Sequence, residues 1–169
     1  MKKALLVIDV QNYFLNSHTK HLPEKIVKYL RRRHRDFALV IFTRFVNNPR
    51  SSSYRLLNWR KCLKSPDTDL VEELKPILTY GSTISKSVLS ALKVSRVQKL
   101  LRKHKITDLY LCGIDTDCCV LATAYDAFDE GYRISVLGKL SMAHTGRSLH
   151  KAALRIVSKN IGSVVSSKK

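Results

Sequence analysis

The chain has 169 residues, of which 44% are hydrophobic and 26% charged, a composition typical of a folded protein and not of a disordered polycation. Its length predicts a single domain over residues 1–169. Its 31 Lys and Arg outnumber 13 Asp and Glu, which gives a formal net charge of +18.

Short apolar runs alternate along the chain with segments whose apolar residues recur at helical spacing. In chain order we expect a strand at 4–10, a helix at 23–34, a strand at 37–43, weaker helical stretches at 54–63 and 68–74, a short strand at 83–86, a helix from 94 to about 104, a strand at 109–113, a helix at 116–130, a strand at 134–137, a helix at 146–160 and a last strand at 164–165. This alternation predicts an α/β fold with a parallel sheet and right-handed crossovers.

The last two predicted helices each carry an apolar face that should pack on the sheet. The expected core positions are Val120, Ala124, Ala127 and Phe128 in one helix, and Leu149, Ala153 and Ile156 in the other. No apolar run approaches the roughly 18 residues of a membrane span, and Asp9 interrupts the first run too early for a signal-peptide core. We therefore expect a cytoplasmic protein that does not associate with membranes.

The basic excess is concentrated in the first part of the chain. Residues 1–66 hold 15 Lys and Arg against 3 acids, whereas residues 67–169 hold 16 against 10. Such a field attracts anionic substrates, nucleic acid or acidic partners. A solvated basic face is the simpler interpretation, because no paired zinc ligands or aromatic RNA-binding stretch accompanies the charge. Nucleic acid stays open as a partner.

Cysteine and histidine spacing gives no sign of a metal site. Cys62, Cys112, Cys118 and Cys119 form no C-x-x-C pair, and the adjacent pair has poor geometry for a structural disulfide. The six histidines show no ligand spacing. No Gly-rich phosphate loop follows the first predicted strand. We expect no metal and no cofactor.

Three kinds of chemically active side chain follow predicted strands. Asp9 follows the first strand, Lys86 ends the short strand at 83–86, and Cys118 and Cys119 lie beyond the strand that ends at Gly113. Ligands of open parallel sheets bind beyond the carboxyl ends of the strands. A carboxylate, an ammonium group and a thiol at one edge are the components of a cysteine nucleophile site. We expect the lysine and the start of the following helix to lower the thiol pKa.

Each of these residues also has a structural interpretation. An Asp at a strand end is often a turn or cap residue, and a buried cysteine commonly behaves as a small hydrophobe. We expect that role for Cys112, inside a strand. A phosphatase loop is excluded, because no Arg occurs six positions after Cys119. Spacing alone does not choose between Cys118 and Cys119.

The strongest motif is the segment GIDTDCCV at residues 113–120, followed by TAYDA at 123–127. It resembles the signature of the isochorismatase-like cysteine hydrolases, a superfamily that includes nicotinamidases, N-carbamoylsarcosine amidohydrolases and ureidoacrylate hydrolases. The segment LLVIDVQNYF at residues 5–14 is similar to the first strand of that family and its continuation, and Lys86 falls where the family has its catalytic lysine. The resemblance covers nearly the whole chain.

The resemblance implies a three-layer, doubly wound α/β fold, with a six-stranded parallel sheet in the order 3-2-1-4-5-6 and helices on both faces. It implies a triad of Asp9, Lys86 and Cys119, in which the second of the adjacent cysteines is the nucleophile. It also implies a cis peptide between Ile114 and Asp115, which would turn the backbone N–H groups of Asp115 and Cys119 toward one oxyanion.

The implied activity is hydrolysis of a small amide or ureido substrate through a thioester on Cys119. Asp9 would take the thiol proton, protonate the leaving amine and then activate water. Isochorismatases proper lack the cysteine, so its presence favours amide chemistry over vinyl-ether hydrolysis. The alternative is a non-catalytic member of the fold that binds an acidic partner or nucleic acid through its basic face.

Departures from the family pattern concern the metal and the substrate. Metal-dependent nicotinamidases carry an Asp and His pair just after the second strand, where this chain reads TRFVNNP at residues 43–49. We therefore predict a metal-independent enzyme and disfavour nicotinamide. Phe14, Phe45 and Trp59 are candidates for the substrate pocket or for the core. We also expect a homo-oligomer, and the basic excess suggests an anionic substrate.

Overall fold

A computed structural model describes residues 1–165 of the chain. Within these residues six parallel strands form one sheet in the order β3-β2-β1-β4-β5-β6, which confirms the expected fold class and strand order. The strands are β1 (Lys3–Ile8), β2 (Leu39–Phe45), β3 (Ser82–Lys86), β4 (Asp108–Gly113), β5 (Arg133–Ser141) and β6 (Gly162–Val165).

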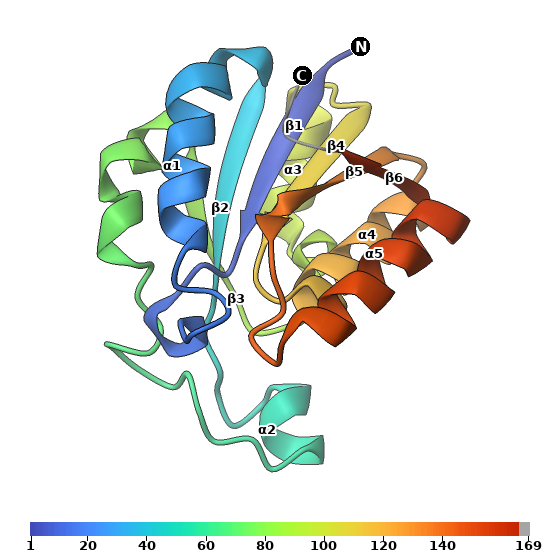
Figure 1. Cartoon of the computed structure of the whole chain (residues 1–169). Coiled ribbons are helices and arrows are strands. Elements are labelled where there is room, and N and C mark those ends of the chain that lie inside the picture. The colour runs from blue at the N-terminus through green and yellow to red at the C-terminus, as the bar shows by residue number, and fades with distance from the viewer. Residues whose placement is uncertain (166–169) are drawn as a thin grey trace.

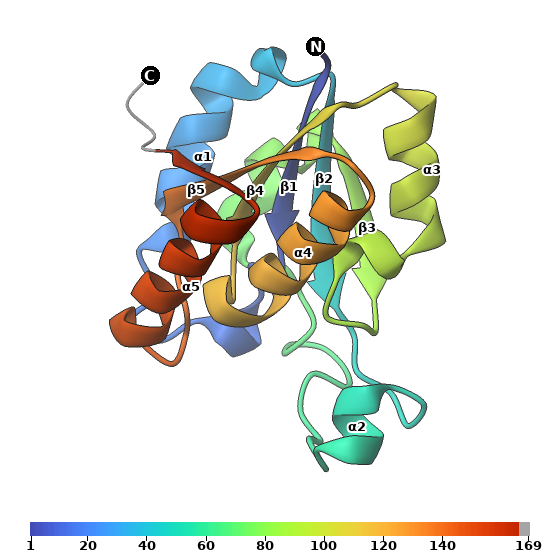
Figure 2. The same cartoon turned by 90° about the vertical axis from the view of Figure 1, so that its right-hand side faces the viewer.

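Helices cover both faces of the sheet and make three layers (Figure 1). They are α1 (Leu22–Arg33), α2 (Ser52–Leu56), α3 (Ser95–Lys103), α4 (Leu121–Asp129) and α5 (Arg147–Asn160). Figure 2 shows α3, α4 and α5 together in front of the sheet, whereas α1 lies behind it. The short helix α2 stands apart from the layers, beyond the carboxyl ends of the strands. No described helix is long and apolar enough to cross a membrane.

The strand β1 forms the centre of both halves of the core. Its residues Ala4 to Ile8 have at most 1% of their surface exposed. Because successive side chains of a strand point to opposite faces, Leu6 packs with the α3 and α4 side, while Leu5 and Val7 pack with the α1 side. An apolar run without alternation is therefore what a strand covered on both faces requires.

The two weak helical predictions between β2 and β3 are largely wrong. Only Ser52–Leu56 forms a helix. Leu56 and Leu57 are each 75% exposed, so this segment buries little apolar surface that would stabilise a longer helix. Residues 68–74 form no helix of their own. Instead Leu70 makes an isolated bridge to Gln11, and a 3-10 segment runs over Glu72–Tyr80 with Pro76 inside it. The proline has no N–H to continue an α-helix.

The predicted core positions of the last two helices need correction. Phe128 and Leu149 are 47% and 49% exposed and therefore do not belong to the core. In α5 the residue Ala153 is buried as expected, but Val157 is buried in place of Ile156. The predicted helix at 116–130 begins with a wide π-helical turn over Thr116–Val120 before α4 starts. This wide turn shifts the side chains that face the sheet relative to a regular helix.

The carboxyl ends of β1 and β4 approach each other very closely at Gly113. Its φ is +119°, and a Cβ at this position would lie 2.0 Å from the carbonyl oxygen of Ile8. The next residue, Ile114, donates its N–H to that same oxygen at 2.8 Å. Only glycine fits this position, and the close approach brings the end of β1 beside the segment that carries the adjacent cysteines.

Substitution of this glycine tests the close approach. Gly113→Ala should lower the free energy of unfolding by about 3–5 kcal/mol, because it adds a positive-φ penalty to a collision with backbone. The matched control is Gly131→Ala, which has φ +85° but no atom within 4 Å of the added Cβ, and should cost only about 1–2 kcal/mol. Urea denaturation of both variants makes the comparison, and equal losses would contradict the packing described for Gly113.

Candidate active site

Asp9 comes directly after β1 and is completely buried. Its φ of 50° lies in the left-handed region, which is uncommon for any residue other than glycine and tolerated by aspartate. The neighbouring strand holds it at two points: the Asp9 N–H donates to the Thr43 carbonyl at 3.1 Å, and the Thr43 hydroxyl donates to Asp9 Oδ1 at 2.7 Å. β2 thus orients the carboxylate and leaves Oδ2 for another partner.

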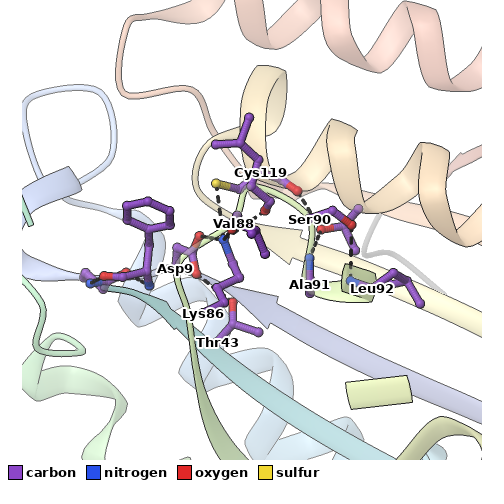
Figure 3. Close-up of polar contacts among 12 residues, drawn as sticks. Asp9, Thr43, Lys86, Val88, Ser90, Ala91, Leu92 and Cys119 are labelled. Atoms are coloured by element: carbon purple, nitrogen blue, oxygen red, sulfur yellow. Dashed lines mark hydrogen bonds and ion pairs between the residues drawn. The ribbon is translucent and has the colours of Figure 1, made fainter. Parts of the chain in front are cut away.

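Lys86 is the last residue of β3 and provides that partner. Its Nζ lies 2.6 Å from Asp9 Oδ2, and neither side chain is exposed to solvent. The ammonium group also donates to the carbonyl oxygens of Val88 at 3.0 Å and Leu89 at 2.9 Å. Its fourth contact is the Cys119 sulfur at 3.5 Å (Figure 3). Lys86 therefore joins the carboxylate and the thiol in one buried cluster.

Cys119 lies in the π-helical turn that precedes α4 and is 6% exposed. The backbone at this position is fixed from α4, because the Thr123 hydroxyl donates to the Cys119 carbonyl at 2.7 Å. The same hydroxyl accepts the Ala91 N–H at 3.0 Å, which ties the turn to the loop that follows β3. The structure thus brings Asp9, Lys86 and Cys119 together from three different strand ends.

Electrostatics at this cluster differ from the sequence prediction for the thiol. A hydrogen bond with Cys118, burial and the Asp9 carboxylate raise the pKa of Cys119 and outweigh the opposing effect of Lys86. The expected lowering of this pKa is therefore wrong for the free protein. Burial alone would lower the pKa of Lys86, but the Asp9 carboxylate and the Cys119 sulfur raise it overall. The surroundings of the cluster thus favour the ammonium form of Lys86 and the protonated form of the Cys119 thiol.

The peptide between Ile114 and Asp115 is cis. The Asp115 carboxylate accepts the His144 N–H at 2.7 Å and contacts His144 Nδ1 at 2.5 Å. Burial raises the pKa of Asp115, and the contacts with His144 act in the opposite direction. His144, in the loop after β5, holds the segment between β4 and the nucleophile in place. No motif in the sequence links His144 to Asp115, so this contact could not be predicted.

Gln11 lies inside the motif at residues 5–14, but no role in the site was predicted for it. Its side-chain amide pairs with the backbone of Phe45, with Nε2 donating to the Phe45 carbonyl at 2.9 Å and Oε1 accepting the Phe45 N–H at 2.6 Å. This pairing fixes the end of β2. It places the Phe45 ring 5.2 Å from Lys86 Nζ and 5.8 Å from the Trp59 ring.

A pocket of about 250 Å³ opens over the thiol. Its lining residues are mostly apolar: Phe45, Ser53, Leu57, Trp59, Leu89, Cys118 and Cys119. Phe45 and Trp59 thus occupy the predicted position, but Phe14 does not line this pocket. Phe14 is 7% exposed and packs in the core, with its ring 5.8 Å from that of His144. Among residues 1–165, this lining includes no Lys, Arg, Asp or Glu.

The residues after β2 do not fit a zinc ion. Asn47 lies in the stretch where metal-dependent nicotinamidases have their Asp and His pair, and its Nδ2 is used to hold the Trp59 carbonyl at 2.8 Å and the Lys61 carbonyl at 3.0 Å. Asn47 therefore positions the loop that carries Trp59. In the part of the chain that the structure describes, no three His, Cys, Asp or Glu side chains group as metal ligands would.

The fold and the site together define an α/β protein with a buried Asp, Lys and Cys cluster at the carboxyl edge of a parallel sheet. Residues 3–169 match the Isochorismatase domain family, and the chain therefore belongs to that family.

The similar proteins include two nicotinamidases and one N-carbamoylsarcosine amidase. Nicotinamidase 3 of Arabidopsis thaliana is 27% identical over 156 residues, which cover 89% of this chain and 78% of that protein. The crystal structure of nicotinamidase PncA from Bacillus subtilis superposes with a TM-score of 0.87 at 24% identity, covering 98% of this chain and 100% of the other. N-carbamoylsarcosine amidase from Thermoplasma acidophilum gives 0.86 at 22% identity, covering 100% and 98%. The structural matches support the fold.

The buried ion pair can be tested by a double-mutant cycle. Lys86→Met should lower the free energy of unfolding by about 3–5 kcal/mol, because it leaves the Asp9 carboxylate buried without its counter-ion. Asp9→Asn combined with Lys86→Met should cost clearly less than the sum of the two single changes. Denaturant unfolding of the four proteins measures the coupling. Strict additivity would show that the two groups do not interact.

Because two of its thiols are buried, the protein should become less stable in alkaline solution. Burial raises the pKa of Cys62 to about 12 and that of Cys112 still further, above the ordinary value of 9.0. Above pH 9 the unfolded chain therefore binds fewer protons than the folded one, and the free energy of unfolding falls as the pH rises. Cys112→Ala should reduce this slope by about 1.4 kcal/mol per pH unit. An unchanged slope in unfolding titrations from pH 9 to 11 would refute a protonated Cys112.

Proposed function

We propose that the protein is a metal-independent cysteine amidohydrolase that cleaves a small amide or ureido substrate through a thioester on Cys119. The observation that carries the proposal is the position of Lys86 Nζ, 2.6 Å from Asp9 Oδ2 and 3.5 Å from Cys119 Sγ, directly beneath a pocket lined by that same sulfur. A buried carboxylate, an ammonium group and a thiol have no comparable use in a purely structural core, because burying two charges is costly.

In the first half of the reaction the thiol proton moves to Asp9 as the sulfur attacks the substrate carbonyl carbon. The C–S bond forms and the carbonyl oxygen becomes an oxyanion. We assign the backbone N–H groups of Asp115 and Cys119 as its hydrogen-bond donors. Asp9 then returns the proton to the leaving nitrogen, the C–N bond breaks, and ammonia or an amine departs from the acyl-enzyme.

In the second half water replaces the amine. Asp9, again a carboxylate, accepts a proton from water as the hydroxide oxygen attacks the thioester carbonyl. The C–S bond breaks, the product carboxylic acid leaves, and Cys119 recovers its proton. Lys86 keeps its contacts with Asp9 and the two loop carbonyls throughout. Its charge stabilises the thiolate whenever the proton lies on Asp9.

The raised pKa of Cys119 fits this assignment of roles. Because the resting sulfur is protonated, its reactivity depends on a base that accepts the proton when substrate is present. Asp9 is held by Thr43 and Lys86 at the position from which it acts.

The pocket favours substrates with a compact, uncharged acyl group. Its lining is dominated by the rings of Phe45 and Trp59 and the side chains of Leu57 and Leu89, with a volume of about 250 Å³. Such a surface accepts an aromatic or apolar group and provides no cation to pair with an anionic one. The names of the similar proteins, nicotinamidase and N-carbamoylsarcosine amidase, are consistent with an amide or ureido bond as the target.

A non-catalytic member of the fold is the competing hypothesis. It gains no support at this edge of the sheet, where the nucleophile and its base are both present and a pocket opens onto the sulfur. A homo-oligomeric state and a cytoplasmic location stay predictions, to be checked by light scattering and by cell fractionation.

The activity is tested by ammonia release from a panel of small aromatic, aliphatic and carbamoylated amides. Cys119→Ala should reduce turnover by at least about 10⁴-fold, because the bond-forming atom is removed. The matched control is Cys118→Ala, which changes the neighbouring sulfur in the same pocket and should retain turnover within about tenfold. Hydroxylamine should trap the acyl group as a hydroxamate with the wild-type protein. Equal loss in both variants, or turnover that survives in Cys119→Ala, would overturn the assignment.

Metal independence is tested on the same assay. Dialysis against a strong chelator should leave turnover unchanged, because the residues after β2 do not form a metal site. A drop in turnover that added zinc restores would contradict this part of the proposal while leaving the cysteine nucleophile intact.

A further inference from the structure

A large basic groove runs between α1 and α5, and the carboxyl end of β5 lies between these two helices (Figure 1). Its volume is about 1080 Å³, roughly four times that of the pocket over Cys119. Cationic side chains from three separate elements line it: Lys25, Lys28 and Arg32 from α1, Lys139 from β5, and Arg147 and Lys151 from α5. We call this surface the basic groove.

Apart from ion pairs at exposed positions, the positive charge of the basic groove is not balanced locally; one such pair joins Arg33, which also lines the groove, to Asp36. Within the described chain, no Asp or Glu is part of its lining. Lys28 pairs with Glu24 at 2.7 Å, but both side chains are about 70% exposed, and an exposed pair of this spacing contributes little. Burial and the nearby charges of Lys25 and Arg147 lower the pKa of His21. The positive fields of α1 and α5 therefore overlap at the same place.

The basic groove is separate from the candidate active site. It shares no lining residue with the pocket over Cys119, and none of its cations contacts Asp9 or Lys86. The proposed hydrolysis makes no use of it. The cations are exposed, as side chains that meet a ligand in solution must be. The groove thus needs an explanation of its own.

The shape and chemistry of the groove restrict what fills it. A second copy placed symmetrically would bring two surfaces of like charge together, which is repulsive. A flat bilayer does not reach into a concave surface. Besides cations, the lining includes the ring of Tyr29 and the apolar side chains of Leu140 and Met142. Cationic walls beside an aromatic ring and an apolar floor are the features with which proteins hold single-stranded nucleic acid, through its phosphates and stacked bases.

We infer that the basic groove binds the sugar-phosphate backbone of single-stranded nucleic acid. Lys25, Lys28 and Arg32 lie at helical spacing on one side of α1 and span about 10 Å along its axis. Lys139 and Lys151 line the same groove from β5 and α5. Contacts of this kind are to phosphates and carry no base sequence. This nucleic-acid binding goes beyond the proposed hydrolysis and does not depend on it.

The experiment measures binding of fluorescent oligouridylate and oligothymidylate, each about 12 nucleotides long, by anisotropy over a range of salt concentrations. The groove variant carries Lys25→Gln, Arg32→Gln, Lys139→Gln and Lys151→Gln, exposed positions where glutamine keeps a good helix or surface residue. Its affinity should fall at least tenfold at low salt. The slope of log K against log salt should become shallower by about 3, at about 0.7 for each lost phosphate contact.

The matched control removes the same charge from α3, a helix that contributes no residue to the lining of the basic groove. It carries four exposed substitutions: Arg96→Gln, Lys99→Gln, Arg102→Gln and Lys103→Gln. Its affinity should stay within about twofold of the wild type. Equal weakening of the groove and control variants would show that net charge alone attracts the oligonucleotide and would overturn the inference.

Two competitors decide the class of ligand. Tripolyphosphate and poly-glutamate should displace the oligonucleotide only at much higher charge concentrations than unlabelled oligonucleotide does. If either one competes equally well, the groove binds small phosphates or acidic proteins, and the nucleic-acid inference is wrong.

Urea denaturation and alkylation of Cys119 should match the wild type in the groove variant. If that variant does not fold, the pair Lys139→Gln and Lys151→Gln alone should still reduce the salt slope by about 1.4.

Discussion

The ion pair between Asp9 and Lys86 is the interaction on which the rest of the site depends. Both charges are fully buried, and such a pair is tolerated only when further hydrogen bonds complete its coordination. Thr43 supplies one to the carboxylate, and the carbonyl groups that follow β3 accept from the ammonium group. The pair joins the ends of β1 and β3 across β2. It thereby fixes the edge of the sheet against which Cys119 is placed.

Charged side chains gather at two separate places in this protein. At the edge of the sheet that holds the candidate site, one carboxylate and one ammonium group balance each other beneath an apolar pocket. The large excess of Lys and Arg is not used there, and part of it collects between α1 and α5. A net charge of +18 therefore says little about the substrate of the cysteine. It describes the exterior, where a phosphate backbone is the ligand that such a field and shape suit.

The strand pattern predicted the fold class and placed Asp9, Lys86 and the two adjacent cysteines at one edge, because buried parallel strands read as continuous apolar runs and their carboxyl ends meet there. The strand order and the choice of Cys119 over Cys118 came from the family resemblance. Features set by long-range packing could not be predicted. Nothing local links Asp115 to His144, which contact each other across 29 residues. The exposure of Phe128 and the raised pKa of Cys119 depend on which elements cover them. Periodicity does not encode that information.

The most direct measurement is site-resolved alkylation by a small aromatic chloroacetamide, followed by peptide mapping of the adjacent cysteines. Although the pKa of Cys119 is raised and that of Cys118 is lowered by the hydrogen bond between them, we expect Cys119 to react far faster, because only Cys119 has a base, Asp9, that accepts its proton as the sulfur attacks. Asp9→Asn should slow this reaction by about 10²-fold or more, because the buried thiol then lacks its base. Reaction at Cys118 with equal speed, or a rate at Cys119 that does not depend on Asp9, would contradict the claim that these side chains form one nucleophile site.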